Sequence, residues 1–298
     1  MIVVICGPTA CGKTRVAVEL AKMIDGEVVS ADSMQVYRGM DIGTAKPAMN
    51  ERDGIPHHLF DVADPTEDFS AAAFKGLARE AIDDILKRGK APILAGGTGF
   101  YINAVIYDDA LAPETPVDAN LRRELMNDPN LYERLKAVDP KSADRIHPNN
   151  IKRAARAYAY YLETGRPISG HAVKRVLRYN TLSIVLYRER ALLYEAIDRR
   201  VISMISKGLA KEVENLLAVG VKEESTAMQA LGYKEMIPYL KGQCTLEEAQ
   251  KAIQQKSRRY AKRQLTWFKN QINGCWLPMD EKTPKEAAME VFNRIGRK

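Results

Sequence analysis

The feature that most constrains the fold is a glycine-rich segment between an apolar run and an amphipathic one. Residues 7–14 read Gly-Pro-Thr-Ala-Cys-Gly-Lys-Thr and fit the pattern G-x-x-x-x-G-K-[ST]. They follow the apolar run Ile2–Cys6, which indicates a buried strand, and residues 13–23 predict a helix. A strand, a phosphate loop and a helix in this order are typical of a parallel α/β sheet.

A loop of this kind binds phosphate groups through its backbone. Glycine allows the chain to curl until successive N–H groups point at phosphate oxygens, and the following helix adds its positive end. Lys13 would place a positive charge on the same oxygens, and the Thr14 hydroxyl would hold Mg²⁺. We expect the whole loop to bind a diphosphate or a nucleotide, namely Gly7, Pro8, Thr9, Ala10, Cys11, Gly12, Lys13 and Thr14. The pattern does not identify the compound that carries the phosphate.

The rest of the first hundred residues alternates strand and helix. Residues 27–31 and 91–95 predict two further strands, and residues 38–69, rich in Gly, Pro and Asp, predict a loop. Ser70 can cap the helix that precedes the last of these strands, and the apolar stripe of that helix includes Leu77. This order predicts an α/β fold with a parallel sheet like that of the P-loop NTPases and with flanking helices.

The pattern changes after this region. Residues 107–180 predict several helices separated by prolines, and the chain from residue 181 again predicts a buried strand. Later residues are mainly helical, with a short strand over 275–277. We therefore expect a P-loop catalytic core of residues 1–106 and 181–298, into which residues 107–180 insert as a helical domain.

Polar residues follow the predicted strands. Asp32 and Ser33 come directly after one strand, and Thr98 lies in the glycine-rich loop after the next. Because ligands bind beyond the carboxyl ends of parallel strands, these residues should share a rim with the phosphate loop. Asp32 suits a proton acceptor or a metal ligand, and Gln35 suits the reading of a base edge. The alternatives are a cap or turn former for Asp32, a surface position for Gln35 and a simple tight turn for the glycine loop.

Positive charge is concentrated in two stretches. The net charge is +7, yet residues 145–200 carry twelve Lys and Arg against four acids, and residues 251–269 carry seven and no acid. The first stretch includes the helical cluster Lys152, Arg153 and Arg156, whereas in the second the cations alternate with aromatic residues that we expect to be core. This distribution favours nucleic-acid binding, and solvated helix faces are the alternative.

Two further features bound the location of the protein. Its four cysteines show no CxxC spacing, which argues against a zinc site or a disulfide framework and favours a reducing cytoplasm. No apolar run approaches the roughly 20 residues that span a bilayer, so we expect no membrane association.

Three functional classes fit these residues. A P-loop small-molecule kinase would share the fold and the phosphate loop, but it would not need the two basic stretches. A nucleotide-regulated RNA-binding protein would need them without covalent chemistry. A transferase that modifies RNA would use the phosphate loop, the acid and the basic stretches together.

Six blocks of sequence point to one family. They are Gly7-PTACGKT, Asp32-SMQVYRGMDIGTAKP, Gly96-GTGFY, Arg145-IHPNNIKR, Gln229-ALGYKE and Tyr260-AKRQLTWF. With these blocks in this order, the chain resembles the bacterial tRNA dimethylallyltransferase family over essentially its full length. Cys11 stands where Ser is usual in that family, and Ala196 stands where Arg is common, which shifts the basic role there to Arg200.

The resemblance implies a reaction. A dimethylallyl group would pass from dimethylallyl diphosphate to N6 of the adenosine just 3′ of the anticodon of a tRNA, with release of diphosphate. It also implies Mg²⁺ and a helical insertion that grips the anticodon stem-loop, and we take a monomer as the default state. Asp32 would accept the proton of the adenine amine, Arg200 would help to stabilise the diphosphate, and Thr98 would help to orient the adenine.

The resemblance further implies a set of tRNA-binding residues. These are Asp32, Ser33, Met34, Gln35, Thr98, Arg122, Lys152, Arg153, Arg156, Gln229, Gly232, Lys234, Lys262, Arg263, Gln264 and Trp267. They fall in the segment after the second strand, in the glycine-rich loop after the third, in the helical insertion and in the mainly helical stretch from residue 191 onward. The tRNA would therefore contact both predicted parts of the chain.

Overall fold

The computed structural model describes residues 1–108, 118–170 and 176–296. The chain forms two compact units, one made of Met1–Ile106 and Leu177–Lys298 and the other of Tyr107–Val176. The first unit contains a sheet with its helices, whereas the elements described in the second are helical. The second unit therefore interrupts the sequence of the first.

A parallel sheet forms the centre of the first unit. In the described part of the chain its strands lie in the order β3-β2-β4-β1-β5-β6, and every neighbouring pair is parallel. The strands are β1 (Ile2–Cys6), β2 (Gly26–Ser30), β3 (His57–His58), β4 (Ala91–Gly96), β5 (Thr181–Tyr187) and β6 (Cys275–Pro278). The predicted strands are confirmed to within one residue at each end. The prediction of an unbroken loop over 38–69 was wrong at β3, because two residues are too few to show a strand period.

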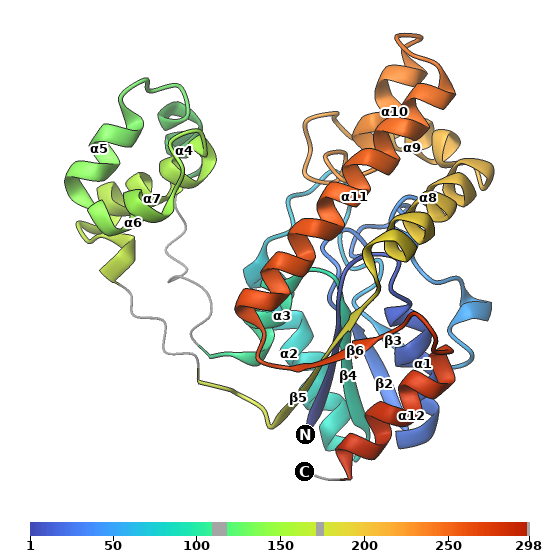
Figure 1. Ribbon diagram of the computed structural model, residues 1–298. Helices are drawn as coiled ribbons and strands as arrows, with labels where there is room; N and C mark the ends of the chain where they lie inside the picture. Colours follow the sequence, from blue (N-terminus) through green and yellow to red (C-terminus); the bar gives the residue numbers. More distant parts are fainter. Residues whose placement is uncertain (109–117, 171–175, 297–298) are drawn as a thin grey trace. The chain divides into compact units, whose positions relative to one another are not determined.

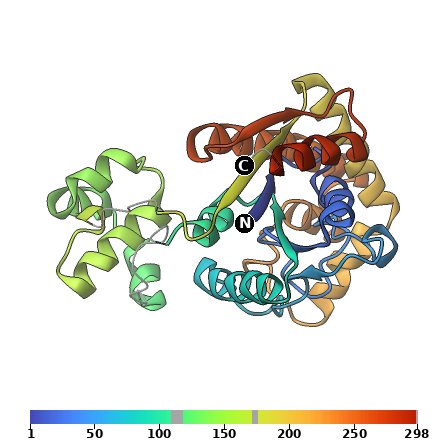
Figure 2. The same cartoon turned by 90° about the horizontal axis from the view of Figure 1, so that it is seen from below.

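One face of the sheet is covered by α1 (Lys13–Ile24) and α12 (Pro284–Ile295), which lie together in Figures 1 and 2. Alternate strand residues such as Val3 and Ile5 pack into the core beneath these helices. Their neighbours Ile2 and Val4 are also fully buried and must face the opposite layer, since successive strand side chains point to opposite faces. Burial on both faces explains why β1 reads as an unbroken apolar run.

The opposite face is covered by α2 (Ala71–Lys87) and α3 (Gly99–Ile106). Phe74 of α2 stacks on Tyr101 of α3 with 4.1 Å between the ring centroids. The predicted cap of α2 is confirmed, because the Ser70 hydroxyl accepts a hydrogen bond from the N–H of Ala73. The predicted apolar stripe was wrong at Leu77, which is 39% exposed because its side chain lies at the margin of the buried face.

A further group of helices lies beyond the carboxyl ends of the strands, as Figure 1 shows. They are α8 (Arg190–Ser206), α9 (Leu209–Ala218), α10 (Tyr233–Leu240) and α11 (Leu246–Gln271). Their apolar residues form a second core with the segment that follows β2, and Tyr37 of that segment is fully buried in it. A short 3₁₀ helix, η1 (Met49–Glu51), follows the same segment. This packing holds the segment after β2 between the carboxyl edge of the sheet and these helices.

The second unit has its own small core. Its elements are α4 (Ala119–Leu125), α5 (Leu131–Val138), α6 (Pro140–Arg145), α7 (Ile151–Thr164) and the 3₁₀ helix η2 (Ile168–Gly170). Leu131 and Leu135 of α5 pack against the alanine face of α7. Nowhere in the described part of the chain is there a helix of the length and apolar character needed to cross a membrane.

Candidate active site

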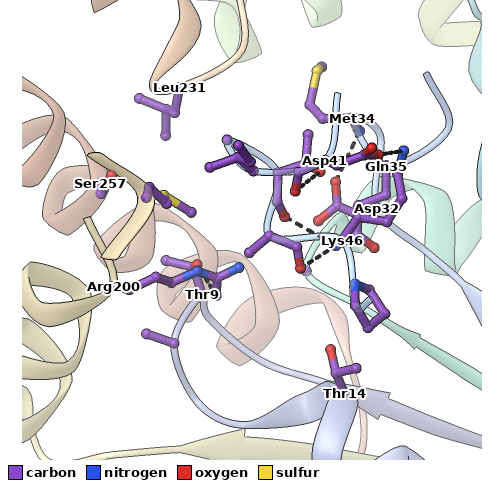
Figure 3. A pocket seen from close by; sticks show the side chains of 18 of the residues that line it. Thr9, Thr14, Asp32, Met34, Gln35, Asp41, Lys46, Arg200, Leu231 and Ser257 are labelled. Atoms are coloured by element: carbon purple, nitrogen blue, oxygen red, sulfur yellow. Dashed lines mark hydrogen bonds and ion pairs between the residues drawn. The ribbon is translucent and has the colours of Figure 1, made fainter. Parts of the chain in front are cut away.

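The loops at the carboxyl edge of the sheet surround a cavity of about 1020 Å³. Because β2, β4 and β1 are neighbours in the sheet, the phosphate loop, the segment after β2 and the loop after β4 lie side by side. Residues of all three segments line the cavity, together with residues of α8 and α11 (Figure 3). The topology thus collects polar groups from distant parts of the sequence around one space.

The phosphate loop is curled as its glycines require. Gly7 has φ +146° and its backbone approaches β5 so closely that an added Cβ would lie 2.2 Å from the carbonyl oxygen of Leu186. Gly12 and Ala10 have positive φ angles of 85° and 64°. Five of the eight predicted residues line the cavity, namely Thr9, Ala10, Gly12, Lys13 and Thr14. Gly7, Pro8 and Cys11 do not line it, and the Cys11 side chain is fully buried in the core.

Lys13 and Arg200 bring two positive charges to the same end of the cavity. Lys13 Nζ donates to the carbonyl oxygen of Pro8 at 2.8 Å, and an Arg200 Nη donates to the Thr9 hydroxyl at 3.3 Å. Burial lowers the pKa of both groups, and the negative charge of Asp32 partly offsets this in both. The positive charge of Arg200 lowers the pKa of Lys13 further. Two partly desolvated cations beside a curled backbone form a site for a compact, multiply charged anion.

Asp32 faces this end of the cavity from the segment after β2 (Figure 3). One carboxylate oxygen accepts from the N–H of Met34 at 2.9 Å, and among the described residues no hydrogen bond reaches the other. Ser33, which also lines the cavity, is held by Thr98, whose hydroxyl accepts from the Ser33 N–H at 3.0 Å. Thr98 itself does not line the cavity, so in this structure it fixes the residue that follows Asp32.

Two glutamines expected to bind the tRNA have their polar atoms bound within the protein. Gln35 is buried; its amide nitrogen donates to the carbonyl oxygen of Thr44 at 3.1 Å and its oxygen accepts from Ser30 at 3.0 Å. Gln264 is buried as well; its oxygen accepts from the Thr9 N–H and its nitrogen donates to the carbonyl oxygen of Gly97, both at 2.9 Å. Both side chains therefore brace loops of the cavity.

Comparison with known proteins decides the family. The model of the IPP transferase family matches residues 35–271 of the chain. The chain belongs to the IPP transferase family. The matched region starts at Gln35, after Asp32, and ends with α11; it includes the whole helical unit and the helices beyond the carboxyl edge of the sheet.

Relatives and solved structures to which the chain is similar carry names of the same family. The chain is 47% identical to a tRNA dimethylallyltransferase of Acetivibrio thermocellus over 94% of this chain and 92% of the relative. It is 48% identical to one of Geobacillus thermodenitrificans over 100% and 96%. A crystal structure of a tRNA isopentenylpyrophosphate transferase of Bacillus halodurans has a TM-score of 0.75 at 45% identity and covers 99% of this chain and 95% of that one. A eukaryotic dimethylallyltransferase acting on tRNA has a TM-score of 0.87 at 29% identity, with 100% and 80% covered.

Tyr260 is a residue of the cavity that the sequence interpretation assigned to the core. It lines the cavity and is half-buried, and burial together with the charge of Asp32 raises the pKa of its phenol to about 12. The available signal was its spacing, since Tyr260 precedes Gln264 by one helical turn and shares its face of α11. Trp267, also expected in the core, is half-buried and packs on Gly99, where an added Cβ would lie 2.1 Å from the indole ring.

Other predicted tRNA-binding residues lie at two places in the first unit. Gln229, Lys234 and Arg263 line the cavity together with Met34, whereas Gly232 does not. Lys262, Arg263 and Trp267 border a separate hollow of about 370 Å³ on α11. Arg263 borders both spaces, so the positive side chains of α11 extend from the cavity to the outer surface of the helix.

The remaining predicted cations belong to the helical unit. Arg122 is exposed on α4, and Lys152, Arg153 and Arg156 are exposed at the start of α7. Desolvation and the neighbouring charges of Arg122 and Arg153 lower the pKa of Arg156. No ion pair to an acid reaches Arg122, Arg153 or Arg156 from the residues that the structure describes. Grouped cations without acidic partners make this surface suitable for a polyanion.

The side chains available as metal ligands suit an Mg²⁺ ion that is bound together with a phosphate group. Thr14 lines the cavity at the phosphate loop, and no group of three or more His, Cys, Asp or Glu side chains suited to a metal occurs in the described residues. Mg²⁺ characteristically takes one or two protein oxygens and completes its shell with substrate phosphates and water. A Thr14 hydroxyl beside a phosphate cradle meets this requirement.

Proposed function

We propose that the chain transfers a dimethylallyl group from dimethylallyl diphosphate to N6 of the adenosine 3′-adjacent to the anticodon of tRNA, releasing diphosphate. The observation that carries the proposal is one cavity that combines a two-cation phosphate cradle with the carboxylate of Asp32. Membership of the IPP transferase family supports the same reaction. The relatives named above are described as dimethylallyl- or isopentenyltransferases of tRNA.

The phosphate cradle would hold the leaving group. The bond between the allylic carbon and the diphosphate oxygen breaks, and negative charge builds on that oxygen. Lys13 and Arg200 line the end of the cavity that holds the phosphate loop, where that charge would develop, and this lowers the barrier more than it favours the ground state. The Thr14 hydroxyl would hold Mg²⁺, which when bound supplies further positive charge to the same oxygens.

Asp32 would activate the acceptor. The exocyclic amine of adenine is a poor nucleophile, and the base must leave the stack to present it to an enzyme. As N6 bonds to the allylic carbon, one of its protons passes to Asp32, whose second oxygen has no partner among the described residues. Ser33, held by Thr98, lies beside Asp32 and would help to orient the base.

The lining of the cavity includes apolar side chains that suit an alkyl group. Met34 and Leu231 lie away from Thr14 in Figure 3, and Ile42, Val201 and Met204 also line the cavity. A five-carbon chain gains from such a surface, at roughly 0.8 kcal/mol for each buried methylene. These apolar side chains support a prenyl diphosphate over ATP as the donor.

Two surfaces would bind the tRNA. In the first unit, Gln229, Lys234 and Arg263 at the cavity, with Lys262 and Trp267 outside it, would contact the nucleotides near the reacting adenosine. In the helical unit, Arg122, Lys152, Arg153 and Arg156 would contact phosphates of the anticodon stem-loop. Cations position a polyanion, whereas Trp267 offers a face for stacking of a base.

A donor comparison tests the proposal. The purified chain is incubated with either labelled dimethylallyl diphosphate or γ-labelled ATP, each with and without tRNA. We expect label in the RNA only from dimethylallyl diphosphate and only when tRNA is present, with loss of the label after substitution of the target adenosine by guanosine. Transfer of phosphate from ATP, or no covalent transfer from either donor, would contradict the proposal.

A further inference from the structure

The side chain of Glu212 on α9 accepts four hydrogen bonds at the wall of the cavity. One carboxylate oxygen accepts from the backbone N–H groups of Asp41 at 2.9 Å and Ile42 at 2.8 Å. The other oxygen accepts from the N–H of Gly43 at 3.0 Å and from the hydroxyl of Tyr233 at 2.6 Å. Three successive N–H groups that converge on one anion form a backbone nest, which here is filled by the protein's own carboxylate.

Tyr233 completes this arrangement from α10. Its side chain is fully buried, and its ring packs so closely on Gly43 that an added Cβ there would lie 2.4 Å from a ring carbon. Burial raises the pKa of the phenol, and the charge of Glu212 raises it further. The hydroxyl therefore keeps its proton and serves as a donor to Glu212 throughout the neutral range.

The segment held by Glu212 is a wall of the cavity. Asp41, Ile42, Gly43, Thr44 and Ala45 all line it. The carbonyl oxygens of Thr44 and Ala45 accept from the amide of Gln35 at 3.1 and 3.4 Å. Hydrogen bonds therefore connect α9 through residues 41–45 to Gln35, and the backbone connects Gln35 to Asp32 three residues earlier.

Lys46 makes a second connection to the same segment. Lys46 is buried; its ammonium contacts the carboxylates of Asp41 and Asp61 at 2.6 Å each and donates to the carbonyl oxygen of Tyr37 at 3.0 Å. Lys46 follows the end of the segment, and its ammonium contacts Asp41 at the start, where the N–H groups also donate to Glu212. Without Glu212, the N–H groups of residues 41–43 would lose the acceptor that fixes their direction.

We propose that Glu212, completed by Tyr233, is a positioning residue of the transfer reaction. It sets the course of residues 41–45 and, through Gln35, the placement of the Asp32 segment beside the phosphate cradle. The inference rests on the proposed function, because the effect is expected on the transfer of the dimethylallyl group. Glu212 contacts backbone and Tyr233 rather than a reacting atom, so its action is indirect.

The test compares Glu212→Gln with Glu214→Gln, a matched change on the same helix. Glu214 is exposed and pairs with Lys211 at 2.7 Å. Glu212→Gln places an amide NH₂ donor opposite other donors, so we expect the single-turnover rate at saturating substrates to fall roughly 10- to 100-fold, the scale of a misplacement of about 1 Å. The Michaelis constants should change much less, and Glu214→Gln should retain the wild-type rate. Tyr233→Phe removes one donor of four and should lower the rate only about 2- to 10-fold.

Two readouts separate positioning from a general loss of stability. Backbone amide exchange at residues 41–43 should accelerate in Glu212→Gln and not in Glu214→Gln, whether or not the protein transfers anything. The double variant Glu212→Gln with Gln35→Ala should be little slower than the slower single variant, because both act through the same segment. Wild-type rates in Glu212→Gln, unchanged exchange at 41–43, or fully additive effects with Gln35→Ala would each overturn the inference. A wild-type chain that transfers no dimethylallyl group would instead overturn the proposed function.

Discussion

The two units of the chain present their charges in opposite ways. In the first unit, Lys13, Arg200 and Asp32 are partly buried and line one cavity, with Lys13 and Asp32 following strands of the sheet and Arg200 on α8. In the helical unit, Arg153 and Arg156 are exposed and have no acidic partner among the described residues. The first arrangement stabilises charge at one fixed point, whereas the second attracts a polyanion over a surface. Changes in the first unit should therefore affect the chemical step, and changes in the second should affect RNA affinity.

The largest effect is expected from Lys13→Ala. Removing the cation of the phosphate loop should lower single-turnover transfer by roughly 10³-fold or more, since the diphosphate loses the positive charge that stabilises its developing negative charge. Affinity for tRNA should not change. Lys22→Ala is the matched control, because Lys22 lies on the same helix but pairs with Glu19 and Asp53. A near-normal rate for Lys13→Ala would remove the phosphate cradle from the mechanism.

A change of affinity without a change of chemistry is expected from Arg153→Ala with Arg156→Ala. Losing two phosphate contacts should weaken tRNA binding and lower the slope of log K against log salt by about two units. The Michaelis constant for dimethylallyl diphosphate and the rate at saturating tRNA should remain at wild-type values. The measurement is a titration of tRNA at several salt concentrations. An unchanged slope would mean that this surface does not contact the RNA backbone.

The smallest effect on transfer is expected at an ion pair that does not line the cavity. Arg88 donates two hydrogen bonds to Glu27, and with His58 it lowers the pKa of that carboxyl from 4.5 to about 2. As pH falls, the unfolded chain takes up this proton first, so the stability that the pair contributes is lost between about pH 4.5 and pH 2. Glu27→Gln should flatten the acid dependence of unfolding while the rate per folded molecule at neutral pH stays unchanged. An unaltered acid dependence of the melting temperature would contradict this role.

The sequence predicted the part of the site that local geometry determines. A phosphate loop needs particular glycines in a row, and Asp32 directly follows a strand, so both could be placed on the same rim before the fold was known. The sheet, its flanking helices and the first core followed from apolar periodicity for the same reason. A change of pattern suggested a helical insertion over 107–180, and the second compact unit of the structure spans Tyr107–Val176.

The rest of the site depends on side chains brought together over long separations. Glu212 is about 170 residues from the backbone groups that it binds, and no motif near it in the sequence indicates that it accepts hydrogen bonds from them. Gln35 and Gln264 have the residue type of base readers, but the protein itself uses their polar atoms, which only the packed structure reveals. Tyr260 was assigned to the core because aromatic residues at helical spacing usually are buried. In each case the partner, rather than the residue type, determines the role.

The central claim is that, in one cavity, Asp32 accepts a proton from the acceptor amine while the phosphate cradle stabilises the leaving diphosphate. Single-turnover transfer by Asp32→Asn, at saturating tRNA and dimethylallyl diphosphate and across pH, tests it most directly. Asn keeps the shape and can still accept from the Met34 N–H, but it cannot take a proton. The account predicts a rate lower by roughly 10²- to 10⁴-fold, with binding of both substrates much less affected. A rate above about a tenth of wild type would contradict it, because the loss would be smaller than acid–base catalysis predicts.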